Sequence, residues 1–140
     1  MVFAVIEDDI EAVIPGLRAE AEAMMIDSCL IERQVGQVVD PDTLEAAPQW
    51  ETVYSGRCRV QIPNASELFK LSGGAGWTLE PVVLQLPVVG SEDVTVGDRA
   101  TITSAVLDRG LADDVLAIIA LFSKTHSLSR RVACKEVEPS

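Results

Sequence analysis

The chain has 140 residues, of which 48% are hydrophobic, 4% aromatic and 24% charged, with a net charge of −11. This length fits a single domain spanning residues 1–140, which can bury about two thirds of the surface of its unfolded chain and needs no metal or disulfide to fold. Residues 1–51 carry 12 acidic and 2 basic residues. This acidic field argues against direct binding of a nucleic-acid backbone, which is usually achieved with clustered Lys and Arg.

The three cysteines, Cys29, Cys58 and Cys134, are far apart and have no histidine cluster beside them. This spacing does not fit a zinc site. It favours free, buried thiols in a reducing cytosol. No segment reaches the 18 or more consecutive apolar residues of a membrane span, so we expect a soluble protein with no membrane partner.

The first element is predicted to be a helix. Its apolar residues recur at offsets of three and four, which places them on one face: Ile6, Ile10, Val13, Ile14, Leu17, Ala21, Met24 and Met25. We expect this helical segment to occupy residues 1–26, ending near Met25. Pro15 and Gly16 interrupt it, which predicts either one kinked helix or two short helices. The apolar face would pack on the protein's own sheet or on a neighbouring subunit.

After the helix, the period of the hydrophobic pattern changes to two, which predicts strands throughout residues 27–137. Cys29–Arg33 is the first, and in Tyr54–Ile62 the apolar residues share one face while Arg57, Arg59 and Gln61 share the other. The segment Val38–Trp50 between them is predicted to be a long exposed connection, because Asp40, Pro41 and Asp42 supply turn chemistry and Pro48 resists central sheet pairing.

A short helix is predicted in S-E-L-F-K-L, followed by a glycine-rich loop containing Ser72, Gly73, Gly74 and Gly76. Pro81 and Pro87 interrupt the strand that starts near Trp77, so it should lie at an edge or be bent. A turn at Gly90–Asp93 and strands at Arg99–Leu107, Val115–Phe122 and Arg131–Val137 complete the chain. The predicted fold class is mainly β (α+β): a small β-barrel or sandwich of five to six strands, with an N-terminal kinked helix and long loops.

None of the candidate catalytic or ligand-binding motifs in the sequence is complete. His126 has serines near it but no G-x-S-x-G or comparable frame. The glycines at Gly73–Gly76 lack the G-K-[ST] of a phosphate-binding loop. Asp108, Asp113 and Asp114 do not have the spacing of a calcium-binding EF-hand loop. We therefore expect no catalytic residue, no metal and no cofactor, and an enzyme is the weakest functional class.

The order of elements carries a family resemblance. It combines the helical segment with Y-S-G-R-C-R-V-Q at Tyr54–Gln61, V-T-V-G-D-R-A-T-I-T-S-A-V-L-D at Val94–Asp108, and T-H-S-L-S-R-R-V-A-C-K-E-V at Thr125–Val137. This arrangement resembles the head-to-tail connector proteins of tailed bacteriophages, of the stopper (head-closure) type. The resemblance implies a virion structural protein of the phage neck, made in the host cytoplasm.

The resemblance also implies the partners. The protein would form a homo-oligomeric ring, a hexamer or dodecamer, below the portal and adaptor proteins, and would attach to a tail terminator or tail tube below. Genomic DNA would be confined in the channel without sequence-specific binding. A loop would project towards the channel, and the two candidates are Val38–Trp50, with Asp40, Pro41 and Asp42, and Asn64–Gly76, with Ser72, Gly73, Gly74 and Gly76.

Arg57, Arg59, Arg130 and Arg131 are the candidate subunit contacts. Arg130 and Arg131 would meet an acidic neighbouring copy or form a solvated strand end. Two alternatives remain open. One is a tail terminator or other neck connector, and the other, of a different class, is a cellular β-barrel binding module. Such a module should have a concave apolar pocket with convergent polar groups.

Overall fold

The computed structural model describes residues 2–65, 67, 69, 81–122 and 127–137, with side chains described from Ile10 onward. Its main elements are the helix α1 (Val2–Ala23) and the strands β1 (Asp27–Val39), β2 (Ala46–Gln61), β3 (Val82–Leu86), β4 (Arg99–Ser104), β5 (Val115–Phe122) and β6 (Arg130–Glu136). A short 3₁₀ helix, η1 (Arg109–Leu111), lies between β4 and β5. The prediction of a mainly β fold with an N-terminal helix is confirmed.

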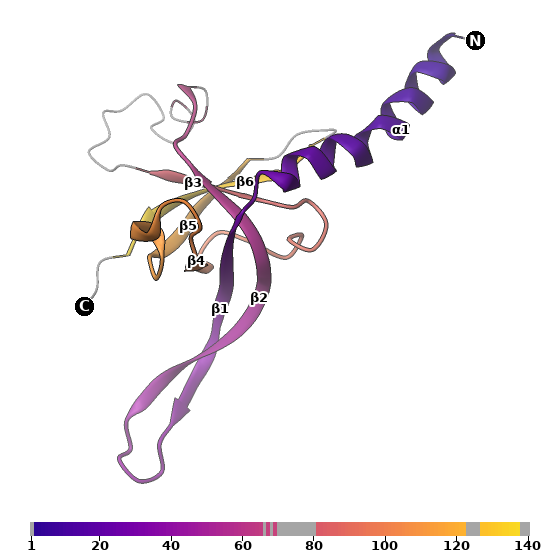
Figure 1. The fold of residues 1–140 in the computed structure, drawn as a ribbon. Coiled ribbons are helices and arrows are strands. Elements are labelled where there is room, and N and C mark those ends of the chain that lie inside the picture. Colours follow the sequence, from indigo (N-terminus) through magenta and orange to yellow (C-terminus); the bar gives the residue numbers. More distant parts are fainter. Residues whose placement is uncertain (1, 66, 68, 70–80, 123–126, 138–140) are drawn as a thin grey trace.

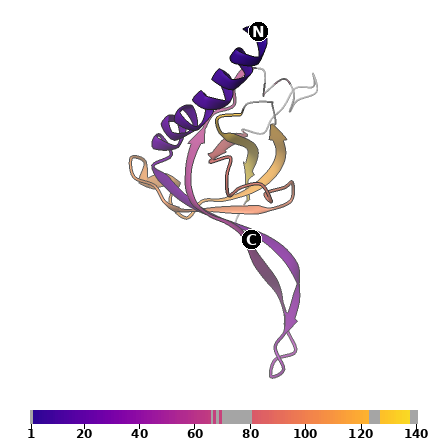
Figure 2. The ribbon, with the colours of Figure 1, turned by 90° about the vertical axis from the view of Figure 1, so that its right-hand side faces the viewer.

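The six strands form one closed antiparallel sheet in the order β1-β2-β3-β6-β5-β4, and β4 pairs with β1 to complete the ring. Figure 1 shows this ring with α1 and the β1–β2 hairpin extending from it, and Figure 2 shows that these two extensions point in opposite directions. Closure leaves the strands of the ring paired on both sides, which removes exposed sheet edges there.

The interior of the barrel is filled by the alternate residues of each strand, as the period of two requires. On β2, Tyr54 and Cys58 are buried, as predicted, whereas Arg57 is exposed. All three cysteines are buried and unpaired, which confirms that they are core residues. The buried core consists of Cys29, Ile31, Tyr54, Cys58, Leu84, Leu86, Val94, Ala100, Ile102, Leu116, Ile118, Val132 and Cys134.

The helix α1 is continuous through Pro15, so the alternative of two short helices is wrong. Of its predicted apolar face, Ile10, Val13 and Leu17 are exposed, and Met25, just beyond the helix, is buried. Figure 1 shows α1 pointing away from the barrel. From Ile10 onward, the expectation that this face packs on the protein's own sheet is therefore not met, because only the end of that part of the segment reaches the core.

The predicted connection at Val38–Trp50 is an exposed hairpin, as expected, but it is much shorter than predicted. β1 and β2 continue as a paired ribbon as far as Val39 and Ala46, which leaves only residues 40–45 as a turn. Val39 pairs with Ala46, and Gln37 pairs with Pro48. The proline is tolerated because β2 has no second neighbour at this position, so no ladder donor is needed there. We call residues 34–50 the arm, since β1 pairs with β4 only as far as Glu32.

β3 also differs from the prediction. Pro81 and Pro87 lie just outside its two ends, and the five residues between them pair with β2 on one side and β6 on the other. The strand is thus short and internal to the closed sheet instead of an edge. Each proline lacks the backbone N–H that would continue the hydrogen-bond ladder. The two prolines therefore limit the length of β3, but they do not move the strand to an edge of the sheet.

Candidate assembly surfaces

The two strands of the arm carry no charged side chain. No charged residue occurs at positions 34–39 or 46–50, although 24% of the whole chain is charged. Its apolar side chains face solvent: Val35 is 50% exposed, Val38 53% and Val39 55%. An isolated two-stranded ribbon is at best marginally stable in water. Exposed strands are usually protected against pairing by charged side chains, especially Lys. The arm lacks this protection.

The tip of the arm is acidic and closed by its own hydrogen bonds. The Asp40 carboxylate accepts from the backbone N–H of Asp42 at 2.8 Å, and the Leu44 N–H donates to the Asp40 carbonyl at 2.8 Å. The predicted turn residues Asp40, Pro41 and Asp42 are all exposed at this tip. Asp40 is therefore a structural turn residue, while Pro41 and Asp42 are presented to the surroundings.

The base of the arm is fixed to the barrel by Arg33. Its guanidinium donates to both carboxylate oxygens of Asp98, at 2.9 and 3.1 Å, and to the backbone carbonyl of Asp93 at 2.7 Å. Asp98 is 1% exposed and also accepts from the backbone N–H of Thr95 at 2.9 Å. The hydrogen bond and charge of Asp98 raise the pKa of Arg33. A bidentate pair of this kind sets geometry as well as energy.

A cation–π contact lies beside this clamp. The Arg99 guanidinium lies 5.1 Å from the centroid of the Trp50 ring. Arg99 begins β4 and Trp50 lies at the end of the arm next to the barrel. The two ribbon strands are thus both tied to the barrel at the same level, β1 by Arg33 and β2 by Trp50.

The four predicted subunit-contact arginines have different surroundings. Arg131 is used within the chain: it pairs with Glu67 at 2.7 and 2.9 Å and also donates to the Gln61 side chain. This interaction raises the pKa of Arg131. Arg130 donates to the Ser91 hydroxyl at 3.0 Å.

Glu67, the partner of Arg131, is itself held by Asn64. The Glu67 N–H donates to the Asn64 side chain at 2.8 Å, and the Asn64 N–H donates to the Glu67 carboxylate at 3.0 Å. This reciprocal pair is a capping box at the start of the predicted short helix. The helix is observed at the described residues Ala65, Glu67 and Phe69.

The arginines of β2 are more available. Arg57 is exposed, and its guanidinium donates to the carbonyl of Glu22 at 3.4 Å. Arg59 is half-buried and aligned with Gln85 of β3. The helix α1 is tied to the barrel by Arg18, which donates to the Ser127 carbonyl at 3.0 Å. Arg57 and Arg59 therefore remain the better candidates for contact with another molecule.

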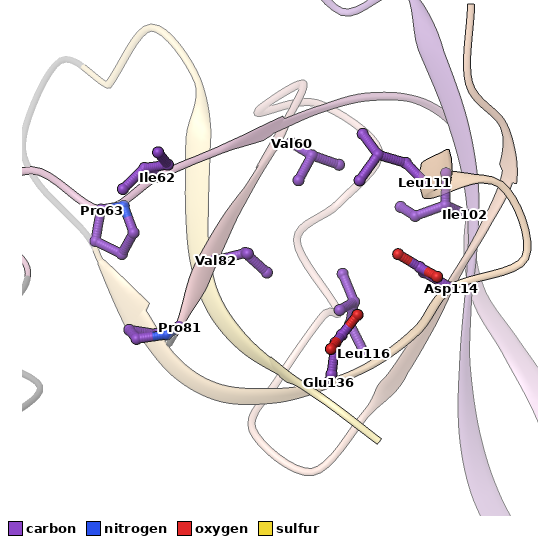
Figure 3. Close-up of a pocket in the computed structure, with 10 residues that line it drawn as sticks. All are labelled: Val60, Ile62, Pro63, Pro81, Val82, Ile102, Leu111, Asp114, Leu116 and Glu136. Atoms are coloured by element: carbon purple, nitrogen blue, oxygen red, sulfur yellow. The ribbon is translucent and has the colours of Figure 1, made fainter. Parts of the chain in front are cut away.

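A pocket of about 610 Å³ opens at one mouth of the barrel, as Figure 3 shows. Its lining is aliphatic except for the carboxylates of Asp114 and Glu136 and consists of Val60, Ile62, Pro63, Pro81, Val82, Ile102, Leu111, Asp114, Leu116 and Glu136. The two carboxylates were not identified as pocket residues from the sequence. The period of two along a strand would have placed both carboxylates inside the mouth. Asp114 lies two positions before the inward residue Leu116, and Glu136 lies two positions after the inward residue Cys134.

Within the described part of the chain, no three His, Cys, Asp or Glu side chains come together as a metal site. Asp108 accepts from the Gly110 N–H at 3.0 Å, which caps η1. Burial raises the pKa of the Cys134 thiol to about 12, so it stays protonated at neutral pH. His126 and the loop with Ser72, Gly73, Gly74 and Gly76 lie outside the described residues.

None of the helices in the described part of the chain is long and apolar enough to cross a membrane.

Residues 17–135 match a family described as a family of unknown function, DUF6093, and the chain belongs to this family. No curated protein matches the chain. Among solved structures, protein SF1141 from Shigella flexneri 2a is similar, with 21% identity, a TM-score of 0.56, and coverage of 81% of this chain and 93% of that one. This likeness supports the fold.

Proposed function

We propose that this member of the DUF6093 family is a head-to-tail stopper of a tailed bacteriophage, a subunit of a ring in the neck that retains packaged DNA and carries the tail attachment surface. The proposal starts from the resemblance of the strand order and its sequences to connector proteins. It is supported by the shape of the subunit, a small closed barrel with two extensions that its own core does not cover.

The uncharged, exposed strands of the arm are the observation that carries the proposal. Two strands with solvent-exposed valines have too little burial of their own to be stable, so they require a partner surface. The barrel is closed and offers no free edge to receive them in the same subunit. Packing against neighbouring copies in a ring supplies such a surface at the high local concentration of an assembly.

The acidic tip suits a position beside confined DNA. Asp40, Asp42 and Glu45 place three carboxylates at the end of the arm. Like charge repels a phosphate backbone, so a channel constriction built from such tips would hold DNA back without binding it. Of the two predicted channel loops, we assign the channel-facing role to Val38–Trp50 in the arm, because its tip carries these carboxylates.

Ring contacts are proposed to involve Arg57 and Arg59 of β2, because Arg131 and Arg130 already have partners in their own subunit. The acidic N-terminal third of a neighbouring copy is the complementary surface. It contains 12 acidic and 2 basic residues in the first 51 positions. The portal or adaptor above and the tail terminator or tail tube below would bind the two faces of the ring.

The test is co-expression with the portal, adaptor and tail-terminator proteins of the encoding phage, followed by electron cryo-microscopy of the purified assembly. The expected result is a ring of this protein between adaptor and tail component, with the arms directed at the channel. Density for the protein elsewhere, or failure to associate with any of these proteins, would refute the proposal.

A matched pair of variants tests the role of the arm. Val38→Lys places a charge on the exposed ribbon, and Val89→Lys places the same charge on an exposed valine of a loop, where the side chain is 73% exposed. We expect Val38→Lys to prevent incorporation into the ring and Val89→Lys to assemble normally, with both monomers folded. Equal incorporation of the two variants would contradict the assignment.

The pocket favours the second candidate, a cellular β-barrel binding module, for which a concave apolar pocket with convergent polar groups was the expected mark. The Asp114 and Glu136 carboxylates at an aliphatic mouth fit that description. The two candidates differ in assembly: a binding module stays monomeric in the presence of phage neck components and binds its ligand alone.

A further inference from the structure

The pocket is the open end of the barrel interior. On β5 the inward residues Ile118 and Leu116 are 1% and 3% exposed, and the next inward position in this direction is Asp114. On β6 the inward residues Val132 and Cys134 are both 0% exposed, and the next is Glu136. Leu116 and Glu136 are direct cross-strand partners. Both inward rows therefore end in a carboxylate at the same mouth.

These two carboxylates have no counter-charge. Within the described part of the chain, neither side chain makes a hydrogen bond or an ion pair, whereas Asp98 and Glu67 each hold an arginine. Their negative charge lies beside an aliphatic surface and attracts a basic group. A cation bound at this end of the pocket would gain charge-assisted hydrogen bonds.

The aliphatic surface continues beyond the pocket. Ile62, at the edge of the mouth, is 84% exposed although it continues the inward row of Cys58 and Val60. Figure 3 shows Ile62 and Pro63 on the opposite side of the opening from Asp114 and Glu136. An occupant that covers the whole site must therefore have an apolar part on the Ile62 side and a basic group on the other.

We propose that the mouth of the barrel binds an extended segment of a partner protein in which a Lys or Arg is flanked by aliphatic side chains. The basic group would lie between Asp114 and Glu136, and the aliphatic side chains would fill the pocket and cover Ile62. A pocket of about 610 Å³ accommodates a few side chains and not a folded domain. The charge of the site disfavours nucleotides, fatty acids and acidic peptides. This inference does not depend on the stopper role.

The test uses the full chain labelled with ¹⁵N and capped peptides of the sequences GLKLVG and GLELVG, which differ in one charge. We expect GLKLVG to shift the amide signals of Ile102 and Leu116 in a saturable manner with a millimolar dissociation constant, and GLELVG to cause no saturable shift there. The small amine hexylammonium should bind more weakly than GLKLVG, because it lacks the second aliphatic side chain.

Two double variants of equal charge change provide the control. Asp114→Asn with Glu136→Gln removes the two pocket carboxylates, and Asp42→Asn with Glu45→Gln removes two at the tip of the arm. The pocket variant should weaken GLKLVG binding about three- to tenfold, the range for two solvent-accessible ion pairs. The tip variant should change it less than about twofold.

Three results would overturn the proposal. The first is no saturable shift with GLKLVG up to about 5 mM, which excludes the millimolar affinity expected here. The second is binding of GLELVG as tight as that of GLKLVG, which would remove the role of the carboxylates. The third is tighter binding of hexylammonium than of the peptide, which would make the pocket a small-amine site instead of a segment site.

Discussion

Replacing Asp98 by Ala should destabilise the protein more than any other single carboxylate change in the arm region. The variant loses two hydrogen bonds from Arg33 and one from the Thr95 N–H, at an acceptor that is 1% exposed. Hydrogen bonds to charged groups contribute about 1.5–3 kcal/mol each. The Arg33 side chain is 40% exposed and regains water, so its share must be discounted. The expected loss of unfolding free energy is about 3 kcal/mol.

Thermal unfolding followed by circular dichroism measures this loss. With an unfolding entropy of about 2.1 cal/mol/K per residue, 3 kcal/mol corresponds to a fall in Tm of about 10 °C for this chain. Asp93→Ala is the control, because it removes the same charge nearby while its backbone carbonyl still accepts from Arg33. It should lower Tm by less than about 2 °C. Equal effects of the two variants would refute the clamp.

Three further predictions concern the barrel. Glu67→Ala breaks the pair with Arg131 and one half of the capping box, and should lower the unfolding free energy by about 2–4 kcal/mol in urea denaturation; a loss below 1 kcal/mol would contradict the pairing. Burial raises the pKa of Cys134 from 9.0 to about 12, so the unfolded thiol ionises first and stability should fall as pH rises from 9 towards 12, with a shallower slope in Cys134→Ala. A slope unchanged by that substitution would contradict a buried, protonated thiol. Replacing residues 37–48 by a two-residue Asn-Gly turn should change Tm by less than about 5 °C, because the arm is exposed, and a larger fall would mean that the barrel depends on it.

For strands with a clear alternation of apolar and polar residues, the sequence was sufficient to predict which side chains are buried. The alternation in Tyr54–Ile62 placed Cys58 on the core face, and the spacing of the cysteines indicated that Cys134 is a buried free thiol; the structure confirms both. A strict period of two decides the face of every residue in a strand once one residue is known to be buried. The same reasoning continued by two residues would have located Asp114 and Glu136.

The arm could not be predicted in this way. Residues 34–50 contain Pro41, Pro48 and Gly36, which usually indicate a loop, and their valines do not face a core. Strand propensity depends largely on what a side chain packs against, and the described residues of the subunit offer the arm no such surface. Likewise, Arg33 and Asp98 are 65 positions apart, and no local pattern links them.

The direction of the arm is set at its base by two irregularities in the β1–β2 ladder. The register shifts once between Ile31 and Glu32 and again between Gln34 and Gly36. β-bulges bend a strand and increase its twist. Arg33 lies between the two shifts and is fixed to the loop around Asp98. A ribbon without core contacts would otherwise take many orientations, so the clamp between two bends is what would allow every copy in a ring to present its acidic tip in the same direction.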